Sequence, residues 1–413
     1  MDAMKLREIN QKLKDPLYRN GLFLISIRVL NVLTGFIFWI LAARLYSIND
    51  IGLATSLISS LGLVILFSGF GFDSSIIRFL PLNDKNKVIN TCMIVPASFS
   101  LLIGLIYIFS ISVFVPSLTF IQQPFYAVII LFFLLMESII TTTGRAFTAL
   151  RRADYYLLQN IFLAPRILFL FPLIFLGSFG IVLSLVLANL ITVFFAFILI
   201  GKFIEFRFKI DMKFIRESFR FSSGNYISSI LFAVPSLILP VIVLNLCGGA
   251  EAAKYFIAFT IGNIVLIVPD ALSASLFVEG SHGESLREIV TKTAKAIYIV
   301  LIPAVMAVYF FAYPLLLFFG KNYVDALELL RLLAITSLIV ALFSLFTSIQ
   351  NIRMKVESLV ELNIIRFILL MGLSYIFILK FGIIGIGYAW MLTYLIMGLR
   401  IIQIMVKENW VYK

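Results

Sequence analysis

The stretch GLFLISIRVLNVLTGFIFWILAARLY, residues 21–46, decides the fold class of this chain. Apart from Arg28, it is an apolar run long enough to cross a hydrocarbon core of about 30 Å as a helix that rises about 1.5 Å per residue. A strand would cross with about ten residues of alternating polarity, and the sequence does not have that pattern. The run is also too long for the core of a signal peptide, so we expect it to remain as a membrane anchor.

Similar apolar runs recur along nearly the whole sequence. The chain has 413 residues, of which 62% are hydrophobic and 13% are charged, whereas soluble domains have about 45–50% and about 25%. This composition predicts an all-α integral membrane protein and excludes an ordinary soluble domain. We place twelve transmembrane helices at residues 20–46, 50–73, 88–115, 124–148, 156–177, 180–202, 218–246, 251–278, 290–319, 325–350, 358–380 and 382–405.

The basic residues predict the orientation. If the N-terminus is cytoplasmic, 25 of the 33 lysines and arginines fall in cytoplasmic segments and only four fall in outer segments. This bias predicts a multi-pass protein of the cytoplasmic (cell) membrane with both termini inside. The net charge of +12 then follows from topology and from contact with anionic inner-leaflet lipids, so no nucleic-acid partner is expected.

Residues 201–225, GKFIEFRFKIDMKFIRESFRFSSGN, form the longest polar stretch and divide the chain nearly in half. Charged and aromatic residues alternate through it, which indicates an amphipathic linker between two bundles. We therefore expect five parts in chain order. These are an amphipathic interfacial segment at 1–19, a six-helix bundle at 20–202, the linker at 203–217, a second six-helix bundle at 218–406 and a cytoplasmic tail at 407–413.

Features of the first half recur about 200 residues later, which predicts an internal repeat. Each repeat holds an even number of crossings, so the halves enter the membrane in the same sense. We expect a pseudo-two-fold axis along the membrane normal to relate them. The matching features are Asp50 and Glu251 (offset 201), Arg166 and Arg366 (offset 200), and the FGI sequences at 179–181 and 381–383 (offset 202).

Three stretches resemble one family of transporters. LAARLYSINDIGLATSLISSLG at 41–62 resembles the first helical hairpin of the polysaccharide and lipid-linked oligosaccharide flippases in the multidrug/oligosaccharidyl-lipid/polysaccharide (MOP) exporter superfamily. GFGFDSSIIRFLP at 69–81 and ILKFGIIGIGYAWMLTYLI at 378–396 are similar to a later segment and to the last hairpin of that family. The residues that carry the first match are Ala43, Arg44, Leu45, Asp50, Ile51 and Gly52.

The resemblance implies a fold and a function. The fold is a V-shaped pair of six-helix bundles around a central cavity. The function is alternating access that carries a polyprenyl-pyrophosphate glycolipid from the inner to the outer leaflet. The implied partners are that glycolipid, membrane lipids and polysaccharide assembly proteins.

Four arginines lie inside the predicted spans. An arginine at the bilayer centre costs about 2.5–3.5 kcal/mol on insertion scales, so it usually faces a cavity, a partner or water. A guanidinium fork matches phosphate oxygens, which makes these arginines candidates for binding an anionic headgroup. Two alternatives stay open: the first arginine snorkels to the cytoplasmic surface, and the second pairs with Glu137 in a helix kinked by Pro165 and Pro172. The candidates are Arg28, Arg166, Arg331 and Arg366.

Buried carboxylates are the candidates for energy coupling. Glu137 and Asp270 lie inside predicted spans, where each could bind a proton or Na⁺ or simply pair with an arginine. Asp73 and Arg78 lie at the expected inner mouth, either as a gate or as ordinary interfacial groups. The sequence has no metal-ligand cluster and no nucleophile–base pair, so we expect no metal, no catalytic residue and no cofactor beyond an H⁺ or Na⁺ gradient.

Three functions are compatible with these features. A flippase for a lipid-linked oligosaccharide or polysaccharide repeat unit explains the excess of buried arginines. A multidrug or small-molecule exporter of the same superfamily would favour an acidic cavity. An integral membrane glycosyltransferase or polymerase would need acidic residues beside a large loop, yet the sequence has no DxD motif and its expected outer loops are short. The flippase is therefore the leading prediction, and an enzyme is not expected.

Overall fold

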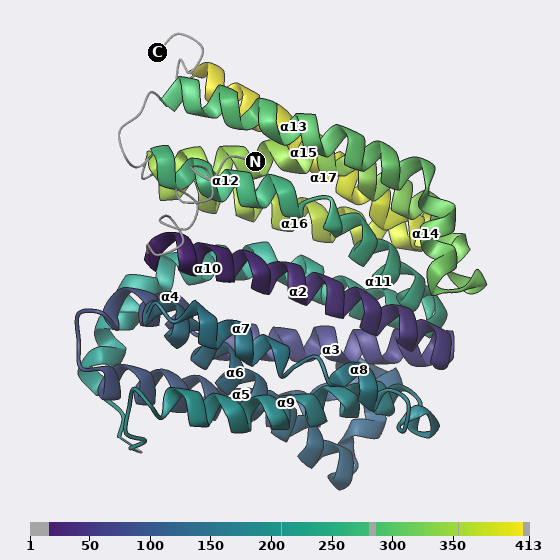
Figure 1. Cartoon of the computed structure of the whole chain (residues 1–413). Coiled ribbons are helices and arrows are strands. Elements are labelled where there is room, and N and C mark those ends of the chain that lie inside the picture. Colours follow the sequence, from purple (N-terminus) through teal and green to yellow (C-terminus); the bar gives the residue numbers. More distant parts are fainter. Residues whose placement is uncertain (1–15, 208, 281–285, 354, 408–413) are drawn as a thin grey trace, which may run out of the picture. The chain divides into compact units, whose positions relative to one another are not determined.

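The structure is a computed structural model that describes residues 16–207, 209–280, 286–353 and 355–407 (Figure 1). Residues 1–15 of the expected interfacial segment and 408–413 of the expected tail lie outside that range. Within it, every regular element is helical and there is no strand. The elements are α2 (Pro16–Leu45), α3 (Ile48–Ser68), α4 (Phe72–Phe79), α5 (Lys85–Phe114), η1 (Pro116–Gln122), α6 (Pro124–Ala149), α7 (Ala153–Ile161), α8 (Arg166–Phe169), η2 (Ile174–Leu176), α9 (Ser178–Ile200), α10 (Met212–Cys247), α11 (Gly249–Ile264), α12 (Ile267–Gly280), α13 (Leu286–Phe310), α14 (Ala312–Phe319), η3 (Lys321–Ala326), α15 (Leu327–Ile352), α16 (Val356–Phe381) and α17 (Ile384–Lys407).

The all-helical membrane fold predicted from the sequence is confirmed. Among the described residues, 10 helices are long and apolar enough to cross a membrane. There are up to 11 if α11 and the start of α12, which are bent by 44°, form one span. Many large apolar side chains point outward, among them Phe109, Val113 and Phe175, which are 78–80% exposed. On a soluble protein such a surface would be a liability, and in a bilayer it is the expected lipid contact.

The expected fifth crossing, 156–177, is the one that is missing from these helices. The chain there is broken into α7, α8 and η2, which are separated by turns. Pro165 and Pro172 explain the break, because proline has no N–H to donate and its ring clashes with the preceding turn. Turn hydrogen bonds satisfy part of the freed backbone, for example from the Arg166 amide to Leu163 O at 3.3 Å and from the Phe169 amide to Pro165 O at 3.2 Å.

The described chain divides into two compact units. Unit 1 comprises residues up to Ser47 and Leu57–Tyr226, and unit 2 comprises Ile48–Ser56 and residues from Ile227. The division falls within α3 and within α10. The expected start of the second bundle at residue 218 therefore lies inside a continuous helix that begins at Met212.

The first residues of α11 touch the beginning of α3 within unit 2. A Cβ on Gly52 would lie 1.8 Å from the carbonyl oxygen of Gly249, and a Cβ on Gly249 would lie 3.1 Å from the carbonyl oxygen of Asn49. The backbones of the two helices therefore approach closely at this point, with no room for a Cβ on Gly52 and little for one on Gly249.

Each unit contains the same glycine turn before its last long helix. Gly177 and Gly382 have φ of 55° and 60°, a region that disfavours side chains with a Cβ. The amide of Gly180 donates to Gly177 O at 2.9 Å, and that of Gly385 donates to Gly382 O at 3.0 Å. These turns pair residues 205 apart, so the offset of 202 suggested by the two FGI sequences is wrong by three residues.

Candidate functional site

Arg166 lies at the start of α8, inside the broken fifth crossing of unit 1. Its Nη2 donates to Thr34 Oγ1 of α2 at 3.3 Å, and its guanidinium carbon lies 5.5 Å from the centre of the Phe38 ring. A Cβ on Gly35 would lie 3.9 Å from Nη2, an ordinary van der Waals distance, so the guanidinium lies directly against this position of α2. The Nε atom is buried and has no hydrogen-bond partner among the described residues. Because buried donors are rarely left unpaired, this atom is free to bind an acceptor.

Glu137 of α6 lies near Arg166. Its carboxylate accepts a hydrogen bond from Asn189 Nδ2 of α9 at 2.8 Å and interacts electrostatically with Arg166. Within the described part of the chain no direct ion pair joins Glu137 to Arg166. The direct pairing considered from the sequence is therefore not present in this structure, and the two opposite charges remain available to a third group.

Amide side chains extend this polar region. Asn31 Nδ2 of α2 donates to Asn160 Oδ1 of α7 at 2.9 Å. Gln159, which is 1% exposed, accepts from Thr143 Oγ1 at 3.1 Å. Helices α2, α6, α7, α8 and α9 thus contribute polar groups to one region of unit 1. We call it the N-terminal polar cluster and define it as Asn31, Thr34, Glu137, Asn160, Arg166 and Asn189.

Arg28 lies on the same stripe of α2 as this cluster. Residues spaced three or four apart share a helix face, so Arg28, Asn31 and Gly35 lie in a row. Asn31 and Gly35 are the positions that approach α7 and α8. Arg28 is exposed and makes no hydrogen bond or ion pair with another described residue. It therefore offers a free guanidinium about 10 Å along the helix from Gly35.

Arg366 has a different environment, in unit 2. It lies in α16, is 1% exposed, and donates from Nε to Tyr394 Oη at 2.9 Å and from Nη1 to Phe232 O at 3.2 Å. Its guanidinium carbon also lies 4.5 Å from the centre of the Phe232 ring. In this structure Arg366 is enclosed and joins three helices, α10, α16 and α17.

Arg331 already has an acidic partner. At the start of α15 its Nη1 forms an ion pair with Glu328 at 2.9 Å, and its guanidinium carbon lies 5.1 Å from the centre of the Tyr309 ring. Its Nε, like that of Arg166, is buried without a hydrogen-bond partner among the described residues, but its charge is partly neutralised by the pair with Glu328. Of the four candidate arginines, those of unit 1 thus offer the more available positive charge.

Asp270 and the pair at the expected inner mouth lie elsewhere. Asp270 of α12 is exposed and accepts from Ser344 Oγ at 3.0 Å. Asp73 follows the end of the α3 span, where burial raises the pKa of its carboxyl and the Arg145 guanidinium opposes that rise. Arg78 is exposed on the same short helix. Five residues separate Asp73 from Arg78, which places them on different faces of α4.

Sequence reasoning missed Asn160 and Asn189. Asn160 follows Gln159 in the mostly apolar run LLQNIFL, and Asn189 lies in VLANLIT. An amide inside a span needs a hydrogen-bond partner, as an arginine does. A search of the spans for amides as well as charges would have found them. The partners of Arg366 could not be assigned from the sequence. Tyrosines are common in such helices, so nothing singles out Tyr394, and a backbone carbonyl such as that of Phe232 leaves no signal in a sequence.

Among the described residues, no group of three or more histidine, cysteine, aspartate or glutamate side chains is placed to hold a metal ion. The N-terminal polar cluster has instead a buried guanidinium donor, a carboxylate and amides. This set of groups suits a ligand that carries phosphate oxygens, and the carboxylate suits a proton or a small cation.

The sequence matches a known family over most of its length. The profile described as polysaccharide biosynthesis protein covers residues 17–277. A search of curated proteins finds no significant match.

Solved structures share the fold. A multidrug resistance MATE family transporter of the MOP superfamily in an inward-facing conformation aligns with a TM-score of 0.68 and 16% identity over 93% of this chain and 96% of that one. Lipid II flippase MurJ in an inward closed conformation aligns with a TM-score of 0.72 and 13% identity over 94% and 87%. A MOP superfamily transporter from Pyrococcus furiosus, described by the reverse polarity of its binding pocket, has a TM-score of 0.59 and 16% identity over 96% of each chain.

Proposed function

Because this chain belongs to the polysaccharide biosynthesis protein family, we propose that it is a flippase for a lipid-linked oligosaccharide or polysaccharide repeat unit. It moves a polyprenyl-pyrophosphate glycolipid from the cytoplasmic to the outer leaflet by alternating access. It does so as a transporter without catalytic residues, in the cytoplasmic membrane and with both termini inside. The MOP fold that it shares with a lipid II flippase and with multidrug transporters supports a transport function.

The observation that carries this proposal is the state of Arg166. The residue has a buried donor without a partner, it holds only one hydrogen bond from Nη2 to a neutral hydroxyl, and no carboxylate neutralises it directly. A diphosphate supplies acceptor oxygens and negative charge, and charge-assisted hydrogen bonds of this kind are about twice as strong as neutral ones.

Arg28 completes the proposed headgroup site. It lies on the same stripe of α2, nearer the end of the helix that the charge distribution assigns to the cytoplasm, and it is exposed. A headgroup that enters from the cytoplasmic side would meet Arg28 first and Arg166 later. In this arrangement the first arginine attracts the anion and the second holds it deeper in the membrane. Arg331 and Arg366 remain further candidates, the first paired with Glu328 and the second enclosed.

The test is a translocation measurement on the full chain. Purified protein in liposomes is given a fluorescent polyprenyl-pyrophosphate glycan in one leaflet, and arrival in the other leaflet is followed with a membrane-impermeant quencher. We expect translocation well above that of protein-free liposomes. The same liposomes loaded with a cationic dye should show no export.

Two outcomes would replace the proposal. Dye export without glycolipid movement would make the chain a multidrug exporter, like the MATE transporter that shares its fold. Transfer of sugar from a donor to the lipid, detected as a new product, would make it an enzyme.

Glu137 is the first candidate for coupling to an ion gradient. Glutamine in its place keeps the size of the side chain and an acceptor for Asn189 but removes the charge. In Glu137→Gln, we expect translocation under an imposed H⁺ or Na⁺ gradient to fall to the rate measured without a gradient. The measurement is the glycolipid assay with and without each gradient.

Asp270 provides the matched comparison. It is the other carboxylate proposed for coupling, and it lies in unit 2 with Ser344 as a donor. If Glu137→Gln still responds to the gradient and Asp270→Asn does not, coupling belongs to unit 2 and the assignment to Glu137 is wrong.

A further inference from the structure

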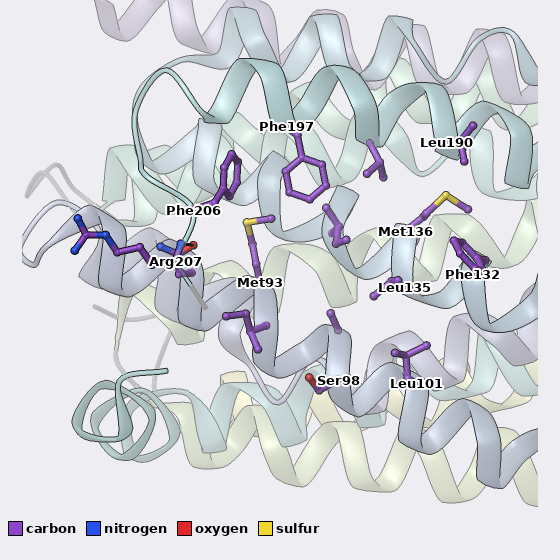
Figure 2. Close-up of a pocket in the computed structure, with 15 residues that line it drawn as sticks. Met93, Ser98, Leu101, Phe132, Leu135, Met136, Leu190, Phe197, Phe206 and Arg207 are labelled. Carbon is purple, nitrogen blue, oxygen red and sulfur yellow. Dashed lines mark hydrogen bonds between the residues drawn. The ribbon is translucent and has the colours of Figure 1, made fainter. Parts of the chain in front are cut away.

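An apolar groove runs along the outer surface of unit 1, apart from the N-terminal polar cluster. Helices α5 and α9 form its walls and α6 forms its floor, and its volume is about 510 Å³ (Figure 2). Its lining is apolar except for Asn90, Ser98 and Arg207. The apolar lining includes Met93 and Leu101 of α5, Phe132 and Met136 of α6, and Leu190 and Phe197 of α9.

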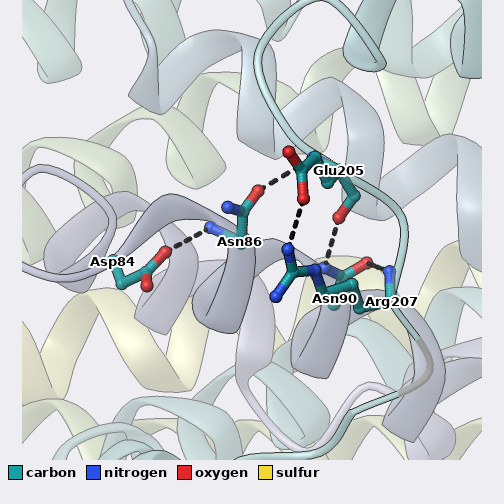
Figure 3. Close-up of polar contacts among 5 residues, drawn as sticks. All are labelled: Asp84, Asn86, Asn90, Glu205 and Arg207. Atoms are coloured by element: carbon teal, nitrogen blue, oxygen red, sulfur yellow. Dashed lines mark hydrogen bonds and ion pairs between the residues drawn. The ribbon is translucent and has the colours of Figure 1, made fainter.

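The mouth of this groove is built by two asparagines one turn apart on α5. Asn86 Oδ1 accepts from the amide of Glu205 at 2.9 Å, and Asn90 Nδ2 donates to the carbonyl oxygen of Glu205 at 3.0 Å. Asn90 Oδ1 also accepts from the amide of Arg207 at 3.4 Å (Figure 3). Asn90 is only 5% exposed. These contacts fix the segment that follows α9 across the end of the groove.

The clamped segment contributes two side chains with different chemistry. The Phe206 ring packs edge to face on Phe197, with ring centres 5.2 Å apart, and so extends the apolar wall. Arg207 stands at the opening (Figure 2). Its side chain is 68% exposed and pairs with Glu205, which is 70% exposed. Pairs this exposed are worth about 0–1 kcal/mol, so an anion of higher charge density can displace Glu205.

The dimensions match one chain of a lipid in one leaflet. Asn90 and Leu101 are eleven positions apart on α5, which corresponds to about 16 Å along the helix. Half of a hydrocarbon core is about 15 Å. The groove begins at the side that the basic residues assign to the cytoplasm, so an inner-leaflet lipid could place its headgroup at Arg207 and one acyl chain along α5 and α9. A polyprenyl chain of many isoprene units is longer than this groove.

The charge of the mouth selects the headgroup. Residues 201–220 contain six basic and three acidic residues, so the region around Arg207 has net positive charge. Each uncompensated basic residue near the surface favours anionic lipid. We propose that the groove binds one anionic glycerophospholipid of the inner leaflet, with its phosphate on Arg207 and one acyl chain between α5 and α9.

Native mass spectrometry of the full chain in detergent tests this binding. The probes are phosphatidylglycerol and phosphatidylcholine with the same acyl chains. We expect one phosphatidylglycerol to be retained about fivefold more tightly than phosphatidylcholine, the factor that one uncompensated basic residue gives. In Arg207→Ala, we expect retention of phosphatidylglycerol to weaken about tenfold, as for loss of one charge-assisted hydrogen bond.

Two further variants separate the groove from general surface charge. Lys85→Ala removes an exposed cation from the start of the same helix, outside the groove, and should leave retention unchanged. Ser98→Trp introduces a large ring at an exposed position that lines the groove and should displace the acyl chain. If Ser98→Trp does not fold, Arg207→Ala and Lys85→Ala still decide the outcome.

Three results would overturn the proposal. They are equal retention of both phospholipids, equal loss in Arg207→Ala and Lys85→Ala, and one-for-one displacement of phosphatidylglycerol by polyprenyl phosphate, which would assign the groove to the tail of a transported lipid. None of these results bears on whether the chain translocates glycolipid, which is measured separately.

Discussion

Replacing Arg166 with alanine is expected to slow glycolipid translocation by about ten- to hundredfold, because a hydrogen bond to a charged group is worth about 1.5–3 kcal/mol. The substitution removes the guanidinium that has a buried donor without a partner. It should leave the fold intact, since the Arg166 side chain makes only one hydrogen bond, to Thr34, among the described residues. The measurement is the initial rate of movement of a fluorescent polyprenyl-pyrophosphate glycan in liposomes.

Two variants serve as references for that rate. Arg166→Lys keeps the positive charge but loses the planar fork that matches two phosphate oxygens, so we expect an intermediate rate. Lys380→Ala removes an exposed cation at the end of α16 and should translocate like the unmodified protein. An Arg166→Ala protein that is folded and equally fast would show that the headgroup binds elsewhere.

Replacing Gly52 with alanine is expected to lower the free energy of unfolding by about 3 kcal/mol, the upper end of the usual range for overpacking. The added Cβ would lie 1.8 Å from the carbonyl oxygen of Gly249. Because the obstacle is backbone, no side-chain rotation relieves it, and the crossing of α3 with α11 must open. The measurement is thermal unfolding of the detergent-solubilised protein, monitored together with its gel-filtration profile.

Alanine at two other glycines, where an added Cβ has more room, should lower the free energy of unfolding less than alanine at Gly52. At Gly249 the new Cβ would lie 3.1 Å from Asn49 O, so a smaller loss is expected. At Gly372 of α16 nothing lies within 4 Å, and alanine there should be neutral or stabilise by up to about 1 kcal/mol, its advantage over glycine in a helix. Equal stability of the Gly52 and Gly372 variants would contradict the close crossing.

Apolar run length was sufficient to predict the helical membrane fold, because a bilayer admits few alternatives to helices. The prolines of the fifth crossing predicted a kink in one helix, whereas the structure breaks the stretch into α7, α8 and η2. The end of the linker was not predictable in this way. Amphipathic residues before 218 continue directly into the apolar part of α10, and a change in polarity along a sequence does not require a break in the helix.

In the internal repeat, the positions with identical residues are not the positions with equivalent backbone conformation. Both FGI sequences lie near the start of a late helix, but the residues with equivalent backbone are Gly177 and Gly382. What the turn requires is a glycine with positive φ, three residues before a second glycine that lies close to a carbonyl. A search for G-x-x-G rather than for identical triplets would have found the correct register.

The candidate site was predictable in residue type but not in arrangement. A buried arginine needs a partner, and the sequence does not say which partner it finds. Arg366 found a tyrosine and a backbone carbonyl. Arg331 and Arg166 each keep a buried Nε without a partner among the described residues, but only Arg331 has an acidic partner, a glutamate one turn away. The difference arises from the helices packed around each residue, which a hydropathy pattern does not specify.

The most direct test of the central claim is an electron cryomicroscopy structure of the full chain with a polyprenyl-pyrophosphate glycan bound. The account predicts phosphate density within about 3 Å of the Arg166 guanidinium nitrogens, the usual distance of such hydrogen bonds, with the Nε atom now paired. A diphosphate bound away from unit 1, with Arg166 still donating only to Thr34, would contradict it.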